Sequence, residues 1–146
     1  MLDFEMGLVN ASGVTAEGLK IALMMASASP AQDEHIAGFH AAPAVPLAGP
    51  PVDISSGEGG RVPGKLLLEA RHIHVVRIGD RPMFVPIVMI DLRWRGGLSL
   101  RHHAADFMVG TAGQGGKLGP IWLDRGAQRQ SGLAANRYFI RAAPVA

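Results

Sequence analysis

The segment Met83–Arg95, MFVPIVMIDLRWR, constrains the fold more than any other part of this 146-residue chain. Its β-branched and aromatic residues, bounded by GDRP and GG, predict a strand. Successive side chains of a strand point to opposite faces. One face would hold Met83, Val85, Ile87 and Met89, and the other Phe84, Val88 and Ile90. Both faces are apolar, although a strand of an antiparallel sheet usually buries only one. Each face therefore needs a covering element from this chain or from another.

The neighbouring segments predict that this strand belongs to an antiparallel meander that begins at about residue 65. KLLLEARHIHVVRI precedes it, and LSLRHH follows it after the glycine pair Gly96–Gly97. Pro86 lacks a backbone donor, which favours an edge position, a bulge or a strand that starts at Ile87. GPIWLD and NRYFIRAA are two further strand candidates, the second of which would close the sheet. Met1–Asn10 is typical of a short strand or an extended arm.

The N-terminal third contains two segments that we expect to be helical. Thr15–Ser27 places Leu19, Ala22, Leu23 and Ala26 at helical spacing. A second, shorter helix is predicted for Ala31–His40. Asp3, Glu5 and Glu17 make the region before the apolar run acidic, so we do not expect an export signal. The predicted fold class is therefore α+β, with one or two N-terminal helices beside the antiparallel sheet.

Residues 41–64, AAPAVPLAGPPVDISSGEGGRVPG, are rich in proline and glycine and predict an extended loop or arm. A connection of this length is long for a compact domain. It would either lie over a neighbouring subunit or act as a plain linker. We expect one domain, residues 1–146, with this segment as an arm within it.

Composition indicates contact with other molecules. Hydrophobic residues make up 48% of the chain and charged residues only 18%. Part of the surface would then be covered by another chain or contact a membrane. No apolar run reaches the length of a membrane-spanning helix. The chain has no cysteine, which excludes disulfides and thiolate chemistry.

The two halves of the chain carry opposite charge. Residues 1–60 hold one basic and seven acidic residues, a net charge of −6, and residues 61–146 hold thirteen basic and five acidic residues, a net charge of +8. Such a split favours head-to-tail contact, or nucleic-acid binding by the arginine-rich half. The same difference in charge would also occur if the two halves packed on each other within one chain. Aromatic residues, which stack on bases, are only 5% of the chain.

Two histidine motifs suggest alternative chemistry. If Gly96–Gly97 form a two-residue turn, Asp91 faces His102 and Ile90 faces His103. An Asp–His pair can orient an imidazole base, and it can equally be an ordinary cross-strand pair. In the alternative reading, a small enzyme or metal-binding domain is centred on Asp91, His102 and His103.

The second motif is HIH. His72 and His74 would share one strand face, with His103 in reach as a third metal ligand. The glycine-rich stretch GTAGQGGKLG departs from a phosphate-binding loop at Thr111 and Leu118, and predicts a surface loop.

We therefore expect a non-enzymatic structural subunit that acts through protein–protein contacts, without a cofactor. The specific role that we expect is that of a virion component, such as a capsid-decorating or tail protein. It would self-associate or join other protein subunits, in the cytoplasm or within an assembled particle. The expected interface residues are Met83, Val85, Ile87, Met89, Arg93 and Arg95.

Overall fold

The computed structural model describes residues 1–43, 48–126 and 129–140. Within these residues the fold is mostly antiparallel β-sheet with one α-helix, α1 (Gln32–Ala41), so the expected antiparallel sheet is confirmed but the helical share is smaller than α+β implies. The largest sheet has the order β11 (Leu133–Tyr138), β8 (Ser99–Ala112), β7 (Pro86–Gly96), β2 (Ala16–Ser27), β3 (Val52–Ile54), and β9 (Leu118–Gly119) also pairs with β8.

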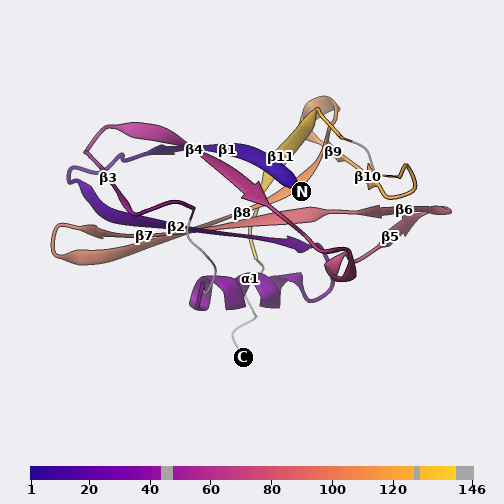
Figure 1. Ribbon diagram of the computed structural model, residues 1–146, viewed down its shortest axis with the longest axis horizontal. Helices are drawn as coiled ribbons and strands as arrows, with labels where there is room; N and C mark the ends of the chain where they lie inside the picture. Colours follow the sequence, from indigo (N-terminus) through magenta and orange to yellow (C-terminus); the bar gives the residue numbers. More distant parts are fainter. Residues whose placement is uncertain (44–47, 127–128, 141–146) are drawn as a thin grey trace.

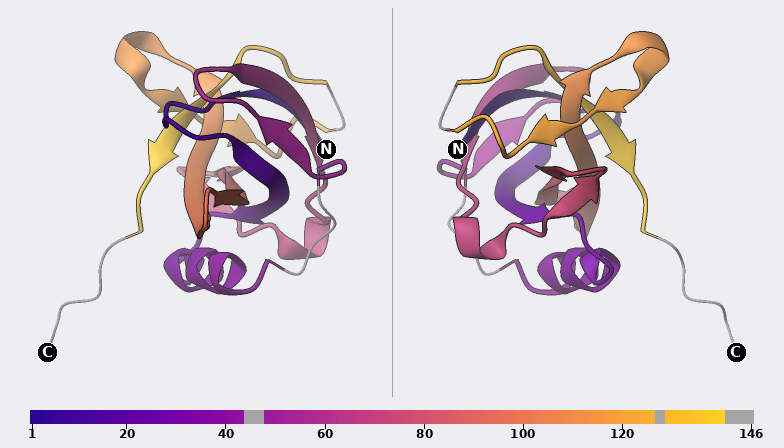
Figure 2. Two further views of the ribbon diagram at one scale, coloured as in Figure 1. Left: turned by 90° about the vertical axis from the view of Figure 1, so that its left-hand side faces the viewer. Right: turned by 90° about the vertical axis from the view of Figure 1, so that its right-hand side faces the viewer.

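Two smaller sheets complete the fold. In one, β1 (Leu2–Val9) pairs with β4 (Gly59–Leu66); the other has the order β10 (Ile121–Trp122), β6 (Arg81–Phe84), β5 (Val76–Ile78). The β1–β4 pair lies on one side of the largest sheet and α1 on the other (Figure 1). The end-on views show the same three layers (Figure 2).

Both faces of β7 are covered by elements of its own chain. On one face, Val88 and Ile90 share a buried cluster with Met6 of β1. On the other, Ile87 and Met89 pack with Ile36 and Phe39 of α1. The sequence therefore correctly predicts that both faces need cover, but no second chain is required to supply it for these residues.

The prediction of a helix at Thr15–Ser27 is wrong, because this segment forms strand β2, which pairs with β7 from Ala16 to Ser27. Leu19, Ile21 and Leu23 alternate onto the β1–β4 face, and Ala22 points to the α1 face. A strand that is covered on both faces has apolar residues at almost every position. The spacing i, i+3, i+4 therefore occurs in it without indicating a helix.

The shorter predicted helix is confirmed as α1. Asp33 and Glu34 lie in its first turn, where negative charge is favourable, and Ile36 and Phe39 form its buried side. At ten residues it is shorter than isolated helices that are stable in water. Its stability therefore depends on its contacts with the sheet.

The described part of residues 41–64 is not an arm without secondary structure. It contains β3 and the first six residues of β4, and β4 pairs with β1 in register from Leu2–Leu66 to Val9–Gly59. The glycines and the proline at the C-terminal end of that range made β4 resemble a loop, and its pairing partner β1 lies 50 to 64 residues earlier in the chain. Residues 44–47 lie outside the described residues.

The meander after residue 65 is present with different boundaries. The β7–β8 hairpin is confirmed, and NRYFIRAA contains the end of β11, which pairs with β8 at an edge. KLLLEARHIHVVRI is not one strand, since β4 ends at Leu66 and a 3₁₀ turn, η1 (Ala70–His72), precedes β5. The strand expected at Met83–Arg95 is broken at Val85, whose carbonyl accepts a hydrogen bond from the Ala28 N–H at 2.8 Å. Pro86 then begins β7.

Among the described residues, none of the helical segments combines the length and the hydropathy needed to span a membrane.

Gly110 allows β9 to pack closely on β8, and this gives a test of the fold. A Cβ at Gly110 would lie 2.6 Å from the Gly119 carbonyl oxygen and 2.9 Å from the Leu118 Cβ. Because backbone atoms must move to make room, we expect Gly110→Ala to lower the free energy of unfolding by about 1–3 kcal/mol. Urea unfolding measures the loss.

Gly60→Ala is the matched control, because a Cβ at Gly60 of β4 would meet no atom within 4 Å. We expect it to change stability by less than about 0.5 kcal/mol. Equal effects of the two substitutions would contradict this packing of β9.

Candidate functional site

A cluster of charged side chains surrounds a buried carboxylate, Asp91 of β7, which is 1% exposed. Its Oδ2 lies 2.8 Å from Nδ1 of His40, at the end of α1, and 2.6 Å from Nε2 of His102, on β8. Its Oδ1 accepts a hydrogen bond from Nε of Arg93 at 2.9 Å. Three elements far apart in the sequence therefore meet at one carboxyl group.

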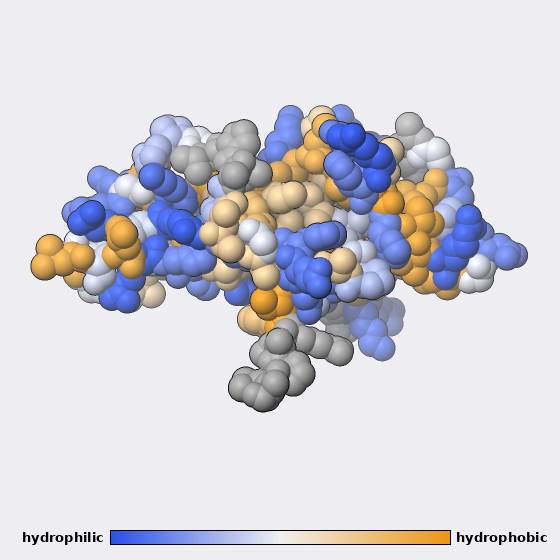
Figure 3. Space-filling view, turned by 90° about the horizontal axis from the view of Figure 1, so that it is seen from below, coloured by the Kyte–Doolittle hydropathy of each residue, from blue (hydrophilic) through white to orange (hydrophobic). Residues whose placement is uncertain are grey.

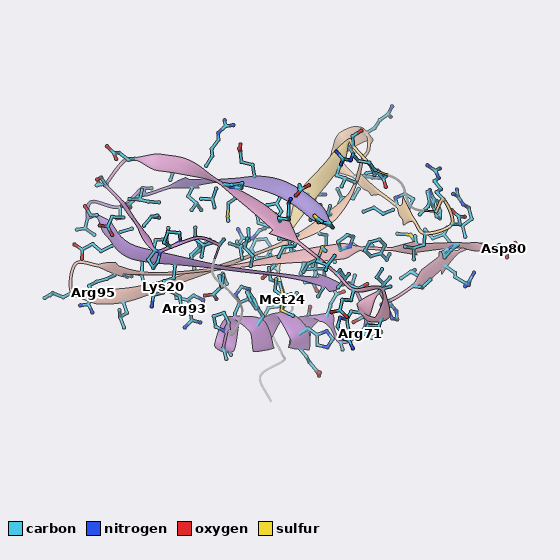
Figure 4. The ribbon with its side chains drawn as sticks, viewed as in Figure 1. Lys20, Met24, Arg71, Asp80, Arg93 and Arg95 are labelled. Atoms are coloured by element: carbon cyan, nitrogen blue, oxygen red, sulfur yellow. The ribbon has the colours of Figure 1, made fainter. Side chains whose placement is uncertain are left out.

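The strand geometry explains why these side chains meet. Asp91 and Arg93 are two residues apart on β7, so they share the face that α1 covers. Figure 4 shows Arg93 extending from β7 on the α1 side of the sheet. His102 pairs directly with Arg93 in the β7–β8 ladder and therefore lies diagonally across from Asp91.

His40 lies between two carboxylates. Its Nε2 is 2.7 Å from Oδ1 of Asp106, a buried residue of β8, and its Nδ1 faces Asp91. An ionised carboxylate only accepts hydrogen bonds. His40 therefore bridges the two carboxylates through its two ring nitrogens. Arg93 supplies a positive charge beside Asp91.

The pKa of Asp91 lies below its ordinary value of 3.8. Burial is the largest single influence and raises this pKa, but the hydrogen bonds from Arg93, His40 and His102 together outweigh it. Asp91 is therefore ionised at neutral pH in spite of its burial.

The structure brings together two of the three residues of the predicted catalytic set. Asp91 and His102 are in contact, as the hairpin predicts, but the register differs by two residues. Gly96 pairs with Ser99 across a Gly97–Leu98 turn, and Gly97 adopts a positive φ of 63°. Asp91 consequently faces Ala104, and not His102, across the ladder.

His103 does not belong to the cluster. It pairs with Leu92, whose side chain lies in the β1–β4 core, so it is on the opposite face of the sheet from His102. It is exposed to solvent. The prediction that His103 shares a site with Asp91 is therefore wrong.

The structure also does not assemble the predicted metal ligands His72, His74 and His103. His72 ends η1, and His74 lies in the irregular segment after it, where its N–H donates to Ser27 Oγ at 2.9 Å. Both line a hollow of about 460 Å³ together with His35, Met24 and Arg71. In Figure 4, Met24 lies over the middle of α1, and Arg71 lies beside one end of the helix. Within the described residues, the group of three whose ligand atoms lie within 4.8 Å of one another is His40, Asp91 and His102.

The expected interface residues do not form an exposed surface. Met83, Ile87 and Met89 are buried inside the chain, and Val85 is half-buried at the strand break. Arg93 is engaged by Asp91. Arg95 is the exposed member of the set, at the hairpin end of β7 (Figure 4).

Sequence reasoning missed His40 and Asp106. The spacing of His102 and Asp106, four residues apart on one strand, indicates that they share a face and was a signal that could have been used. No local pattern connects His40 with Asp91, which follows it by 51 residues. Only the docking of α1 on the sheet brings them into contact.

No family model, curated protein or solved structure matches this chain.

Removing the charge of Asp91 tests whether the cluster holds α1 on the sheet. Asp91→Asn removes the buried carboxylate that Arg93, His40 and His102 all contact, so we expect a loss of about 3–5 kcal/mol in the free energy of unfolding at pH 7. Urea unfolding in buffer with a chelator measures it. Asp80→Asn, at an exposed position, should change stability by less than about 0.5 kcal/mol. A loss as small in Asp91→Asn as in this control would contradict the role of the cluster.

The lowered pKa of Asp91 predicts a pH dependence with a definite sign. The unfolded chain protonates this carboxyl near 3.8, and the folded chain only at lower pH. The stabilisation from ionised Asp91 is therefore complete above that value and is lost as the pH falls through the lowered pKa. We expect the stability difference between the native chain and Asp91→Asn to shrink as the pH falls below about 4. A difference that grows with acidity would contradict this sign.

Proposed function

We propose that the protein is a subunit of an assembly and acts through protein–protein contacts made at the two ends of its long axis. The observation that carries the proposal is the distribution of exposed apolar side chains. The helix α1 covers the middle of the largest sheet, and the β7–β8 hairpin and the small sheet that contains β5 and β6 project beyond it at opposite ends (Figure 1). Figure 3 shows hydrophobic groups at both ends of the long axis.

At one end, the tip of the β7–β8 hairpin presents Leu98, which is fully exposed, and Leu100, which is 81% exposed. We call these two residues the hairpin tip. Single exposed leucines are ordinary, but two neighbours on a projecting turn form an apolar patch. Such a patch favours contact with another protein surface.

At the other end, β5 is an edge strand. Within the described part of the chain it pairs with β6 alone, so its second edge offers free backbone donors and acceptors. Its neighbourhood exposes Val75, Val76 and Ile78. We call these three residues the β5 edge. Free backbone groups beside aliphatic side chains suit the addition of a strand or loop from another chain.

A second copy of the chain is the occupant that we propose. The hairpin tip and the β5 edge are unlike surfaces at opposite ends, so contact between them would be head-to-tail and would build a ring or an open array. The opposite charges of the two halves contribute less to this contact than the sequence suggests, because some of them form ion pairs within the chain. Arg61 contacts Glu5 at 3.0 Å, and Lys65 contacts Asp3 at 3.7 Å, across the β1–β4 pair.

Nucleic-acid binding has weaker support. Arg93 is engaged by Asp91, and Arg81 makes two hydrogen bonds to Asp124 at 2.9 and 3.1 Å. These arginines are less available for a phosphate backbone. Salt-dependent retention on DNA would favour this alternative. A virion role and a cytoplasmic or particle location stay predictions.

Light scattering tests the proposal. We expect the native chain at micromolar concentration to have a mass above the 15.4 kDa of one chain, because apolar groups at both ends gain by leaving water. The double variant Leu98→Lys with Leu100→Lys, and the single variant Ile78→Lys, should each have the mass of one chain. Leu67→Lys, which changes an exposed leucine directly after the end of β4, near the middle of the long axis (Figure 1), should behave as the native chain.

Mixing the two end variants tests the head-to-tail geometry. Each retains one intact end, so the mixture should form a one-to-one pair that neither variant forms alone. A pair formed by one variant alone would mean that like ends associate. A native mass of 15.4 kDa, unchanged on tenfold concentration, would contradict self-association.

A further inference from the structure

We infer that His40, Asp91 and His102 form a binding site for a divalent transition-metal ion, with zinc the best chemical match. The site does not depend on the proposed assembly. Its three ligand atoms, Nδ1 of His40, Oδ2 of Asp91 and Nε2 of His102, lie within 4.8 Å of one another. They come from α1, β7 and β8, so the fold itself sets their spacing.

The donor set suits zinc. Two imidazole nitrogens and one carboxylate oxygen are a recurrent ligand set for this ion, and imidazole also suits copper, nickel and iron. Magnesium and calcium prefer oxygen ligands alone. The chemistry therefore selects a transition metal over the hard cations.

The spacing of the ligand atoms needs only a small adjustment. Oδ2 of Asp91 is 2.8 Å from the His40 nitrogen and 2.6 Å from the His102 nitrogen. Ligand atoms about 2.0–2.1 Å from a tetrahedral zinc lie roughly 3.3 Å apart. Each of these two distances must open by less than about 1 Å to admit the ion, and the two histidine nitrogens, which lie within 4.8 Å of each other, must come to the same spacing. The His102 side chain is 42% exposed and has room to supply that movement.

The surrounding hydrogen bonds orient these atoms as metal sites require. Asp106 accepts from Nε2 of His40 at 2.7 Å, which leaves Nδ1 to present its lone pair to an ion. Arg93 holds Oδ1 of Asp91 and leaves Oδ2 as the ligand. A carboxylate behind a ligand histidine and a donor behind a ligand carboxylate are the usual second layer of a zinc site.

The ion would take the lone pair of Nδ1 of His40, which now lies against Oδ2 of Asp91. A proton held between these two atoms would have to leave to solvent when the ion binds. With neutral histidines, the two carboxylates and Arg93 sum to one negative charge, which favours a divalent cation. Three protein ligands leave a fourth position for water.

Calorimetric titration of the full-length, tag-free chain with zinc chloride tests the site. We expect one ion to bind per chain at pH 7. His102→Ala removes the most exposed ligand and spares the buried contacts of His40, so it should fold and bind zinc at least tenfold more weakly. Asp106→Asn should weaken binding about 10–100-fold, because it loosens the orientation of His40.

His103→Ala is the matched control. It removes the neighbouring histidine, which is exposed on the opposite face, and should leave zinc affinity and stoichiometry unchanged. Circular dichroism would show that each variant is folded. Absence of zinc binding by the native chain, or equal affinity of His102→Ala and the native chain, would overturn the inference. The cluster would then be a hydrogen-bonded network only.

Discussion

The contact between α1 and the sheet depends on one buried carboxylate, Asp91. A ten-residue helix has little stability of its own, and Ile36 and Phe39 supply the apolar part of its docking. His40, at the end of the helix, binds Asp91 and Asp106 from its two ring nitrogens. Nη2 of Arg93 donates to the His40 carbonyl at 2.5 Å, which satisfies one of the backbone acceptors that a helix leaves free at its last turn. The apolar side chains would tolerate a small slide of the helix, whereas these directional bonds would not.

The cluster shows how a core can contain charge without leaving polar atoms unpaired. Moving ions from water costs several kcal/mol each, so a lone buried carboxylate would be protonated. Here the desolvation of Asp91 is outweighed by three donors, and its pKa is lowered. Among the described residues, no buried side-chain nitrogen or oxygen lacks a partner. Such a network adds little to stability over a well-packed apolar core, and its main effect is to specify one arrangement of the layers.

The patterns that predict this fold correctly are those that local sequence determines. The β7–β8 hairpin follows from two apolar runs around a glycine pair, and α1 follows from the helix-start pattern SPAQDE. β2 was mistaken for a helix because both of its faces are buried, which removes the alternation that identifies a strand. β4 was missed because its glycines and proline are typical of a loop, and only pairing with β1 makes them a strand. The residues of the candidate site were predictable to the same extent. Asp91 and His102 are neighbours in a local hairpin and were predicted, whereas His40 contacts them only because a helix distant in the sequence docks on the sheet.

The lengths of α1 and β8 explain why the Asp91 cluster is partly exposed and why no helix covers the hairpin end of the sheet. β8 has 14 residues and extends over about 47 Å, whereas the ten residues of α1 cover about 15 Å. The helix therefore shelters only part of the face of β7 and β8. Asp106 lies under it and is buried, and His102, four residues nearer the hairpin, lies beyond it and is exposed. Because α1 is shorter than β8, it also leaves Leu98 and Leu100 exposed to water at the hairpin tip. One difference in length thus produces both a buried carboxylate pair with an accessible histidine and a projecting apolar end. The candidate metal site and the candidate contact surface therefore lie on one hairpin, separated by only a few residues.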